Sequence, residues 1–150
     1  MRLLFFIFLG FILFSCKSKQ MEEVISKYPD GSPKVVKYFI TNDLKQKVYV
    51  KETDYYPGNI KKVEGPLKDG FKHGKWCYWF RNGKKWSEGE FLYGLSNGRF
   101  FIWKEDGSRN LIANYKFGKP DGLWIFWDKN GKITRKVCIK NNKKFKEVLF

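Results

Sequence analysis

The stretch from Gly70 to Gly83, GFKHGKWCYWFRNG, recurs as GLSNGRFFIWKEDG from Gly94 and as GKPDGLWIFWDKNG from Gly118. The copies start 24 residues apart, and each keeps three glycines and one tryptophan at fixed positions. A fixed period of this size is typical of stacked supersecondary units, none of which buries its apolar side alone. The repeat therefore predicts an array of similar units, and it favours a binding or structural module over an enzyme.

Each copy has the pattern of a β-hairpin. The run from Gly74 to Phe80 is short, aromatic and rich in residues that favour strands. Asn82-Gly83 follows it and supplies the positive φ angles that tight hairpin turns need. A second run returns from Lys84 to Tyr93, and the polar segment from Gly70 to Gly74 is expected to form the opposite turn. The sequence therefore predicts an all-β meander.

The repeat weakens toward both ends of the chain. Tyr28 to Gly31 and Tyr56 to Asn59 are fainter copies of the turn motif, and Asn142 occupies the next glycine position downstream. We expect a repeat domain over residues 28–141 and a C-terminal tail or cap over residues 142–150. Atypical terminal units are what capping of such an array requires.

Three motifs carry a family resemblance: Phe80 to Gly83, Glu88 to Phe91, and the glycine pair Gly94 and Gly98. They resemble the MORN repeat, in the bacterial variant labelled YwqK-family antitoxin, over roughly residues 28–141. The resemblance implies a single twisted antiparallel β-meander built from the 24-residue hairpins, a MORN-like solenoid, and it implies no known activity. The third unit departs from the pattern, but a small residue is kept at the equivalent positions Gly65, Gly89 and Ala113.

The first residues predict export. Arg2 is followed by twelve apolar residues, too short a run for a transmembrane helix but typical of a secretory signal. The run ends in Leu13-Phe14-Ser15-Cys16, which resembles a bacterial lipobox, so Cys16 would carry a diacylglycerol. Residues 1–15 are then a lipoprotein signal peptide and residues 16–27 a flexible tether. An ordinary signal peptide with an incidental cysteine is the alternative.

The resemblance to a lipobox implies a location in the cell envelope, on the outer membrane or a periplasm-facing membrane surface. Lys17 in place of aspartate favours sorting to the outer membrane. The full chain has a net charge of +15, and a basic surface of this size favours anionic surfaces. Export argues against nucleic acid as the partner. Simple solvation of the sheet by lysines is the alternative explanation of the charge.

Cysteine and histidine usage gives no indication of a metal site or cofactor. Cys77 and Cys138 are expected in strands five positions apart, which separates them by roughly 24 Å at the usual strand spacing. A disulfide needs Cα atoms within about 7 Å, so we expect two unpaired thiols. His73 is the single histidine, and we expect it to be a solvated turn residue.

Strand alternation places Trp76, Phe100 and Trp124 on one face and Trp79, Trp103 and Trp127 on the other. Since both faces are apolar, either the sheet curls over itself or one ladder of rings is exposed for a partner. In the second case the predicted binding groove consists of the following residues: Trp79, Trp103, Trp127, Arg81, Arg99 and Lys104.

The sequence lacks a nucleophile–histidine pair, a phosphate-binding loop and a metal constellation, so we expect no catalysis. The function that fits is a non-catalytic, lipid-anchored envelope protein that binds another protein or acts as a scaffold. Two alternatives stay open. One is an antitoxin-like protein that neutralises a toxin by direct contact, and the other is a binder of anionic lipid or acidic polysaccharide.

Overall fold

The computed structural model describes residues 19–150 as one open antiparallel sheet of fourteen strands. Within these residues no helix is long and apolar enough to cross a membrane. The strands are Met21–Lys27 (β1), Pro33–Thr41 (β2), Lys47–Tyr56 (β3), Ile60–Lys68 (β4), Phe71–Lys72 (β5), Gly74–Trp79 (β6), Lys85–Leu92 (β7), Leu95–Ser96 (β8), Gly98–Trp103 (β9), Arg109–Lys116 (β10), Lys119–Pro120 (β11), Gly122–Trp127 (β12), Ile133–Lys140 (β13) and Lys143–Leu149 (β14).

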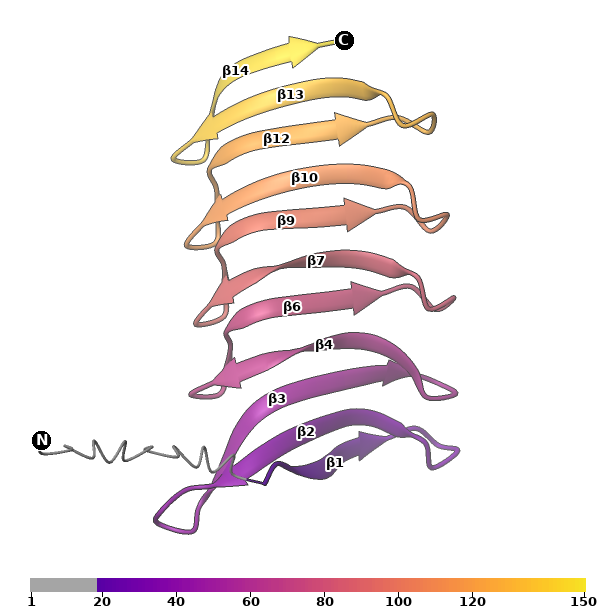
Figure 1. The fold of residues 1–150 in the computed structure, drawn as a ribbon, viewed down its shortest axis with the longest axis vertical. Helices are drawn as coiled ribbons and strands as arrows, with labels where there is room; N and C mark the ends of the chain where they lie inside the picture. The colour runs from indigo at the N-terminus through magenta and orange to yellow at the C-terminus, as the bar shows by residue number, and fades with distance from the viewer. Residues whose placement is uncertain (1–18) are drawn as a thin grey trace, which may run out of the picture.

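The strand order follows the chain, so the predicted meander is confirmed. The main strands run β1-β2-β3-β4-β6-β7-β9-β10-β12-β13-β14, and the two-residue strands β5, β8 and β11 pair with β4, β7 and β10. In Figure 1 these strands stack as a tall ladder, from β1 at the bottom to β14 at the top. Extensive contacts join only strands that are neighbours in the sheet.

The sheet extends beyond the predicted repeat domain at both ends. Residues 21–27, expected within the tether, form β1 and pair with β2, so that part of the tether prediction is wrong. Glu23 of β1 accepts hydrogen bonds from Lys47 Nζ at 2.9 Å and from the Tyr49 hydroxyl at 2.7 Å. An outermost strand open to solvent needs little apolar periodicity, which is why its polar sequence gave no signal.

At the other end of the chain, most of residues 142–150 forms β14, which pairs with β13 and caps the array. The predicted signal peptide over residues 1–15 and the predicted lipidation site Cys16 lie outside the described residues.

The turns alternate between the two long edges of the sheet. We call the edge with turns 42–46, 69–70, 93–94, 117–118 and 141–142 the Gly70 edge, and the edge with turns 28–32, 57–59, 80–84, 104–108 and 128–132 the Gly83 edge. The chain also joins the sheet at the Gly70 edge, because β1 runs from that edge toward the first turn of the Gly83 edge (Figure 1).

The tightest turns are at the Gly70 edge. There both turn residues have positive φ, as in Asp69 (52°) and Gly70 (80°), which is the pattern of a type I′ hairpin turn. In the Gly83-edge turn at residues 80–84 only Gly83 has positive φ, whereas Asn82 acts through its side chain. Asn82 Oδ1 accepts a hydrogen bond from the Lys84 amide at 3.0 Å. The expectation that Asn82 and Gly83 together supply the positive φ angles of this turn is therefore wrong, because only Gly83 does so.

The core depends on a large ring from one hairpin packing over a small residue of the preceding hairpin. The Trp76 ring is fully buried and lies over Gly65, where an added Cβ would collide with it. Trp76 Nε1 also donates a hydrogen bond to the Pro66 carbonyl at 2.9 Å. Phe100 lies over Gly89 in the same way. The small residue of the repeat is thus required by the ring that follows it.

A continuous zigzag of rings joins the hairpins along this face, which we call the Trp76 face. The rings, in order, are Trp76, Phe91, Phe100, Tyr115 and Trp124, with neighbouring centroids 5.1 to 6.3 Å apart. Most of the pairs are edge-to-face, the geometry in which each aromatic pair contributes about 0.5–1.5 kcal/mol beyond its buried area. A sheet without a second layer obtains much of its cohesion in this way.

Cys77 in β6 and Cys138 in β13 are free thiols, five strands apart in the sheet. His73 differs from its expected place as a solvated turn residue. Its ring packs against Tyr93 with centroids 5.0 Å apart, and its Nδ1 is buried without a hydrogen-bond partner. The tight turn after Asp69 brings the Tyr93 turn alongside, which shields the imidazole.

We predict that Gly89→Ala lowers the free energy of unfolding by about 1–3 kcal/mol, because the new methyl group overpacks against Phe100. Urea denaturation measures the change. The neighbouring Glu90→Ala, at an exposed position, is the control and should change stability by less than about 0.5 kcal/mol. Equal stabilities for the two variants would contradict the proposed role of the glycine.

Candidate interaction face

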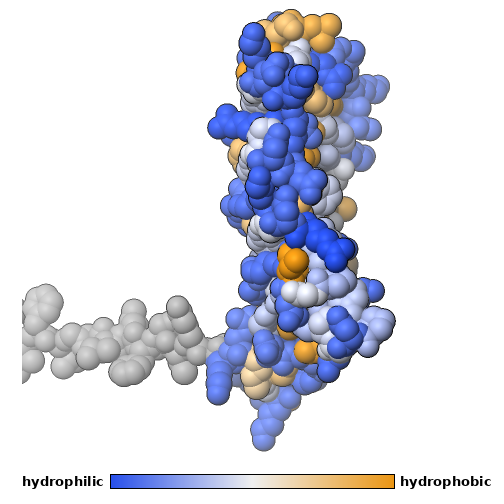
Figure 2. Space-filling model, turned by 90° about the vertical axis from the view of Figure 1, so that its right-hand side faces the viewer, coloured by the Kyte–Doolittle hydropathy of each residue, from blue (hydrophilic) through white to orange (hydrophobic). Residues whose placement is uncertain are grey.

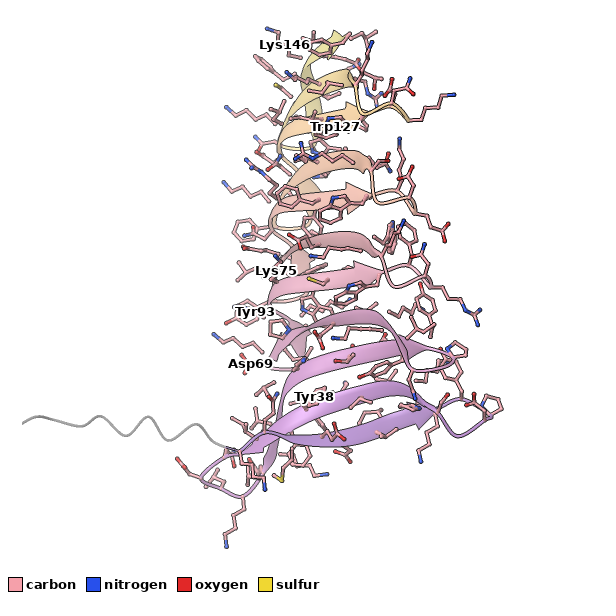
Figure 3. The ribbon with its side chains drawn as sticks, turned by 45° about the vertical axis from the view of Figure 1, so that its right-hand side comes forward. Tyr38, Asp69, Lys75, Tyr93, Trp127 and Lys146 are labelled. Atoms are coloured by element: carbon pink, nitrogen blue, oxygen red, sulfur yellow. The ribbon has the colours of Figure 1, made fainter. Side chains whose placement is uncertain are left out.

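Trp79, Trp103 and Trp127 lie at equivalent positions of β6, β9 and β12, on the face opposite the Trp76 face. We call this the Trp79 face. The predicted alignment of the three tryptophans in successive hairpins is confirmed, and all three rings are half-buried. Figure 3 labels Trp127 near the Gly83-edge end of β12, and Lys75 and Lys146 belong to the same face.

A β-bulge recurs in β4, β7, β10 and β13, the long strands that follow the Gly83-edge turns, and it turns side chains toward this face. The unpaired residues are Lys62, Trp86, Asn110 and Thr134, again 24 residues apart. Such a bulge bends the strand and shifts its alternation by one residue. Consequently Lys85 lies opposite Trp79, and Arg109 lies opposite Trp103.

Cations and tryptophans alternate along the face as a result. Lys61 Nζ lies 5.3 Å from the centroid of the Trp79 ring, and Lys85 Nζ lies 5.6 Å from that of Trp103. The Arg109 guanidinium carbon completes the series at 5.9 Å from the Trp127 ring. Each distance is within the range of a cation–π contact. These three cations were missed from the sequence, although their 24-residue spacing was a usable signal.

The three cations predicted to flank the groove are arranged differently. Arg81 and Lys104 lie in Gly83-edge turns, where Lys104 Nζ donates to the Asp128 carbonyl at 2.6 Å. Arg99 lies on β9 and lines a hollow of about 80 Å³ beside Lys75 and Glu88. The structure therefore brings Arg99 to the Trp79 face and leaves Arg81 and Lys104 at its margin.

A second column of side chains on the Trp79 face changes character along the sheet. Its members, paired strand by strand, are Glu64, Cys77, Glu88, Phe101, Ile112, Ile125 and Lys136. The column is acidic toward β4, apolar in the middle and basic at β13. The change comes from Ile112, which replaces the glutamate found at this position in the two preceding units.

Both glutamates of the column are held between lysines. Glu88 lies 3.0 Å from Lys75 and 2.6 Å from Lys85, and Glu64 makes the same pattern with Lys51 and Lys61. Burial raises the pKa of each carboxyl, but hydrogen bonds from the lysines outweigh burial, so both pKa values lie below the ordinary value of 4.5.

The apolar part of the column lies at a hollow of about 280 Å³. Phe101 and Trp103 stack beside it with centroids 6.1 Å apart, and Ile112, Arg109 and Trp127 complete most of its lining. Within residues 19–150 Arg109 has no carboxylate partner, since Ile112 stands where a glutamate would be. The hollow can therefore accept an apolar side chain next to a hydrogen-bond acceptor. Among the same residues there is no cluster of three metal-ligating side chains.

Comparison with known proteins identifies two of the repeat units. Residues 72–93 and 120–141 match the family model described as MORN repeat variant. These two segments are similar to MORN-variant repeats. They start 48 residues apart, two periods of the array, and the unmatched unit between them is the one that contains Ile112.

Among solved structures, one titled "Crystal Structure of TarM" is similar to this chain with a TM-score of 0.34 and 15% sequence identity. The similarity covers 85% of this chain but 21% of the TarM chain. No curated protein matches the sequence.

The glutamates of the Trp79 face predict an acid-sensitive stability. Because their folded-state pKa values are lowered, the stabilisation is present above pH 4.5 and is lost as the pH falls through the lowered values. We predict that Glu64→Gln/Glu88→Gln unfolds less steeply with acid than the native chain. Chemical denaturation at several pH values between 3 and 7 measures the slope, with the turn variant Glu105→Gln as control for the loss of a charge. An unchanged slope in the double variant contradicts the prediction.

Proposed function

We propose that this chain is a non-catalytic, lipid-anchored repeat protein of the cell envelope that binds a protein partner through the Trp79 face. The observation that carries the proposal is the partly buried apolar patch formed by Phe101, Ile112 and Ile125 beside Trp103 and Trp127. A single-layer sheet offers no second layer to cover it. MORN-variant repeats are consistent with a binding role and specify no reaction.

The composition of the patch favours a protein over other partners. Aromatic residues and arginine are the residues enriched at the centres of protein interfaces, and here they surround a hollow large enough for one apolar side chain. Arg109 beside the hollow has no carboxylate partner within residues 19–150, so a partner segment with an acidic residue next to its apolar side chain fits the patch.

The anchor is supported by the sequence Leu13-Phe14-Ser15-Cys16 at the end of an apolar run. Lipid attached to Cys16 would hold the sheet at the membrane surface, where a non-catalytic binding module can recruit its partner. Two hydrocarbon chains on one residue are the kind of double signal that stable anchoring requires.

We predict that Cys16→Ala abolishes lipid incorporation. Cells grown with a palmitate analogue should label the native chain and leave the variant unlabelled, and the variant should move from the membrane pellet to the soluble fraction. Cys77→Ala is the matched control and should keep the label. Equal labelling of both variants would falsify the anchor.

We predict that Trp103→Ala keeps the fold and weakens partner binding by about 2 kcal/mol or more, as expected for a central interface tryptophan. Affinity capture from envelope extracts, followed by titration of the captured protein, measures the loss. Trp76→Ala is the contrasting variant, because it empties the buried core and should cost about 3–5 kcal/mol of stability. If Trp103→Ala unfolds the chain as Trp76→Ala does, the Trp79 face is structural. A captured toxin would favour the antitoxin-like role.

A further inference from the structure

The turns of the Gly70 edge, with the short strands β5 and β8 that follow them, expose large apolar side chains. The exposed fractions are 76% for Leu44, 55% for Phe71, 47% for Tyr93, 49% for Leu95 and 55% for Phe117. In the described part of the chain the turns of the Gly83 edge contribute no such side chain. Near that edge, Trp86 packs against Tyr78 and Phe80, and Leu149 and Phe150 are exposed at the end of β14. Figure 2, which looks onto the Gly83 edge, shows a largely hydrophilic surface.

Two of these aromatic residues occupy positions that the fold itself disfavours. Tyr93 and Phe117 have φ values of 47° and 49° in their two-residue turns. Such turns prefer asparagine, aspartate or glycine, and the equivalent turns use Asp69 and Asn141. Both rings stay about half exposed, although Tyr93 packs on one side against His73, and neither favours the turn. Burial and backbone conformation therefore do not explain them.

Both edges carry an excess of positive charge. Residues 42–46, 68–73, 92–97, 116–121 and 140–143 of the Gly70 edge contain seven lysines and three aspartates. Counted with one flanking residue on each side, the Gly83-edge turns 27–33, 56–60, 79–85, 103–109 and 127–133 contain eight lysines and arginines and four acidic residues. The exposed apolar side chains of its turns therefore distinguish the Gly70 edge, where they lie among lysines.

We propose that the Gly70 edge lies on an anionic bilayer surface, so that the sheet rests on the membrane along its length. Aromatic side chains and lysines together favour the headgroup region, where rings enter the interface and ammonium groups meet anionic lipid. The turns project in one row along the edge, which matches a flat surface better than a compact protein partner (Figure 1).

The position of the chain's start supports this orientation, and this step rests on the lipid anchor proposed above. Cys16 and Met21 are separated by five residues, which span at most about 18 Å even when fully extended. Since Met21 begins β1 at the Gly70 edge, a lipid on Cys16 holds that edge close to the bilayer. The opposite edge is a strand length away, roughly 20–25 Å for six to seven residues.

The test uses the full chain with Cys77→Ser and Cys138→Ser and one added cysteine for a fluorophore. The added cysteine is Lys119→Cys at the Gly70 edge or Lys129→Cys at the Gly83 edge, both exposed lysines. The protein is reconstituted with vesicles of phosphatidylcholine and phosphatidylglycerol that carry a nitroxide-labelled lipid as quencher. We expect quenching at position 119 to exceed that at position 129 by about threefold or more, and to weaken in high salt.

Equal quenching at the two positions overturns the proposal. So does stronger quenching from a label at Glu22→Cys than at position 119, because the sheet would then stand on β1. Labelling with the palmitate analogue reports the anchor separately, because an edge that binds the vesicles would also make Cys16→Ala float. If the native chain carries no label, the proposed lipid is absent, and the edge is still decided by quenching in Cys16→Ala added to the same vesicles.

A triple variant, Phe71→Ser/Leu95→Ser/Phe117→Asn, separates surface contact from folding. We expect it to lose the difference in quenching between the two edges. Phe117→Asn alone should raise the melting temperature, because asparagine tolerates the left-handed conformation better than phenylalanine. The matched control Phe145→Ser/Leu149→Ser removes equally exposed apolar side chains from β14 and should keep the difference. A triple variant that retains it contradicts the proposal.

Discussion

The structure depends on the close approach of an aromatic ring to a backbone that carries almost no side chain. Trp76 over Gly65, and Phe100 over Gly89, bring successive hairpins together in a sheet that has no second layer. In a sandwich or a barrel, apolar side chains meet those of another layer or of the far wall. Here each ring is buried against the strand beside it, so cohesion runs along the sheet rather than across it.

This arrangement leaves the other surfaces of the sheet free for different tasks. The Trp76 face carries the zigzag of rings, and the bulged strands place cations beside the tryptophans of the Trp79 face. Ile112 then converts one region of that face from charged to apolar. Because the aromatic cohesion lies on the opposite face, such a change at one unit does not disturb the packing of the hairpins.

Much of the fold could be predicted from the sequence, because the 24-residue period fixes which residues are equivalent. The meander, the two ladders of rings and the recurrence of a small residue at Gly65, Gly89 and Ala113 followed from that period, whereas the reason for the small residue, a ring packed over it, is known only from the structure. Strand β1 did not, since a polar strand at an open edge resembles a tether. The candidate site was predicted only in part. The tryptophans align as expected, but the cations beside them are Lys61, Lys85 and Arg109, because a bulge shifts the alternation of each long strand and hairpin pairing alone does not reveal it.

Because extensive contacts join only strands that are neighbours in the sheet, the array can lengthen or shorten by whole repeat units. An insertion or deletion of one whole period joins ends that already have the same geometry: without residues 94–117, Tyr93 would connect to Gly118, which has the same place as Gly94. The surrounding hairpins would keep equivalent neighbours. The number of repeat units therefore sets the length of the sheet, and single substitutions within a unit set what its faces bind, so the two properties can evolve independently.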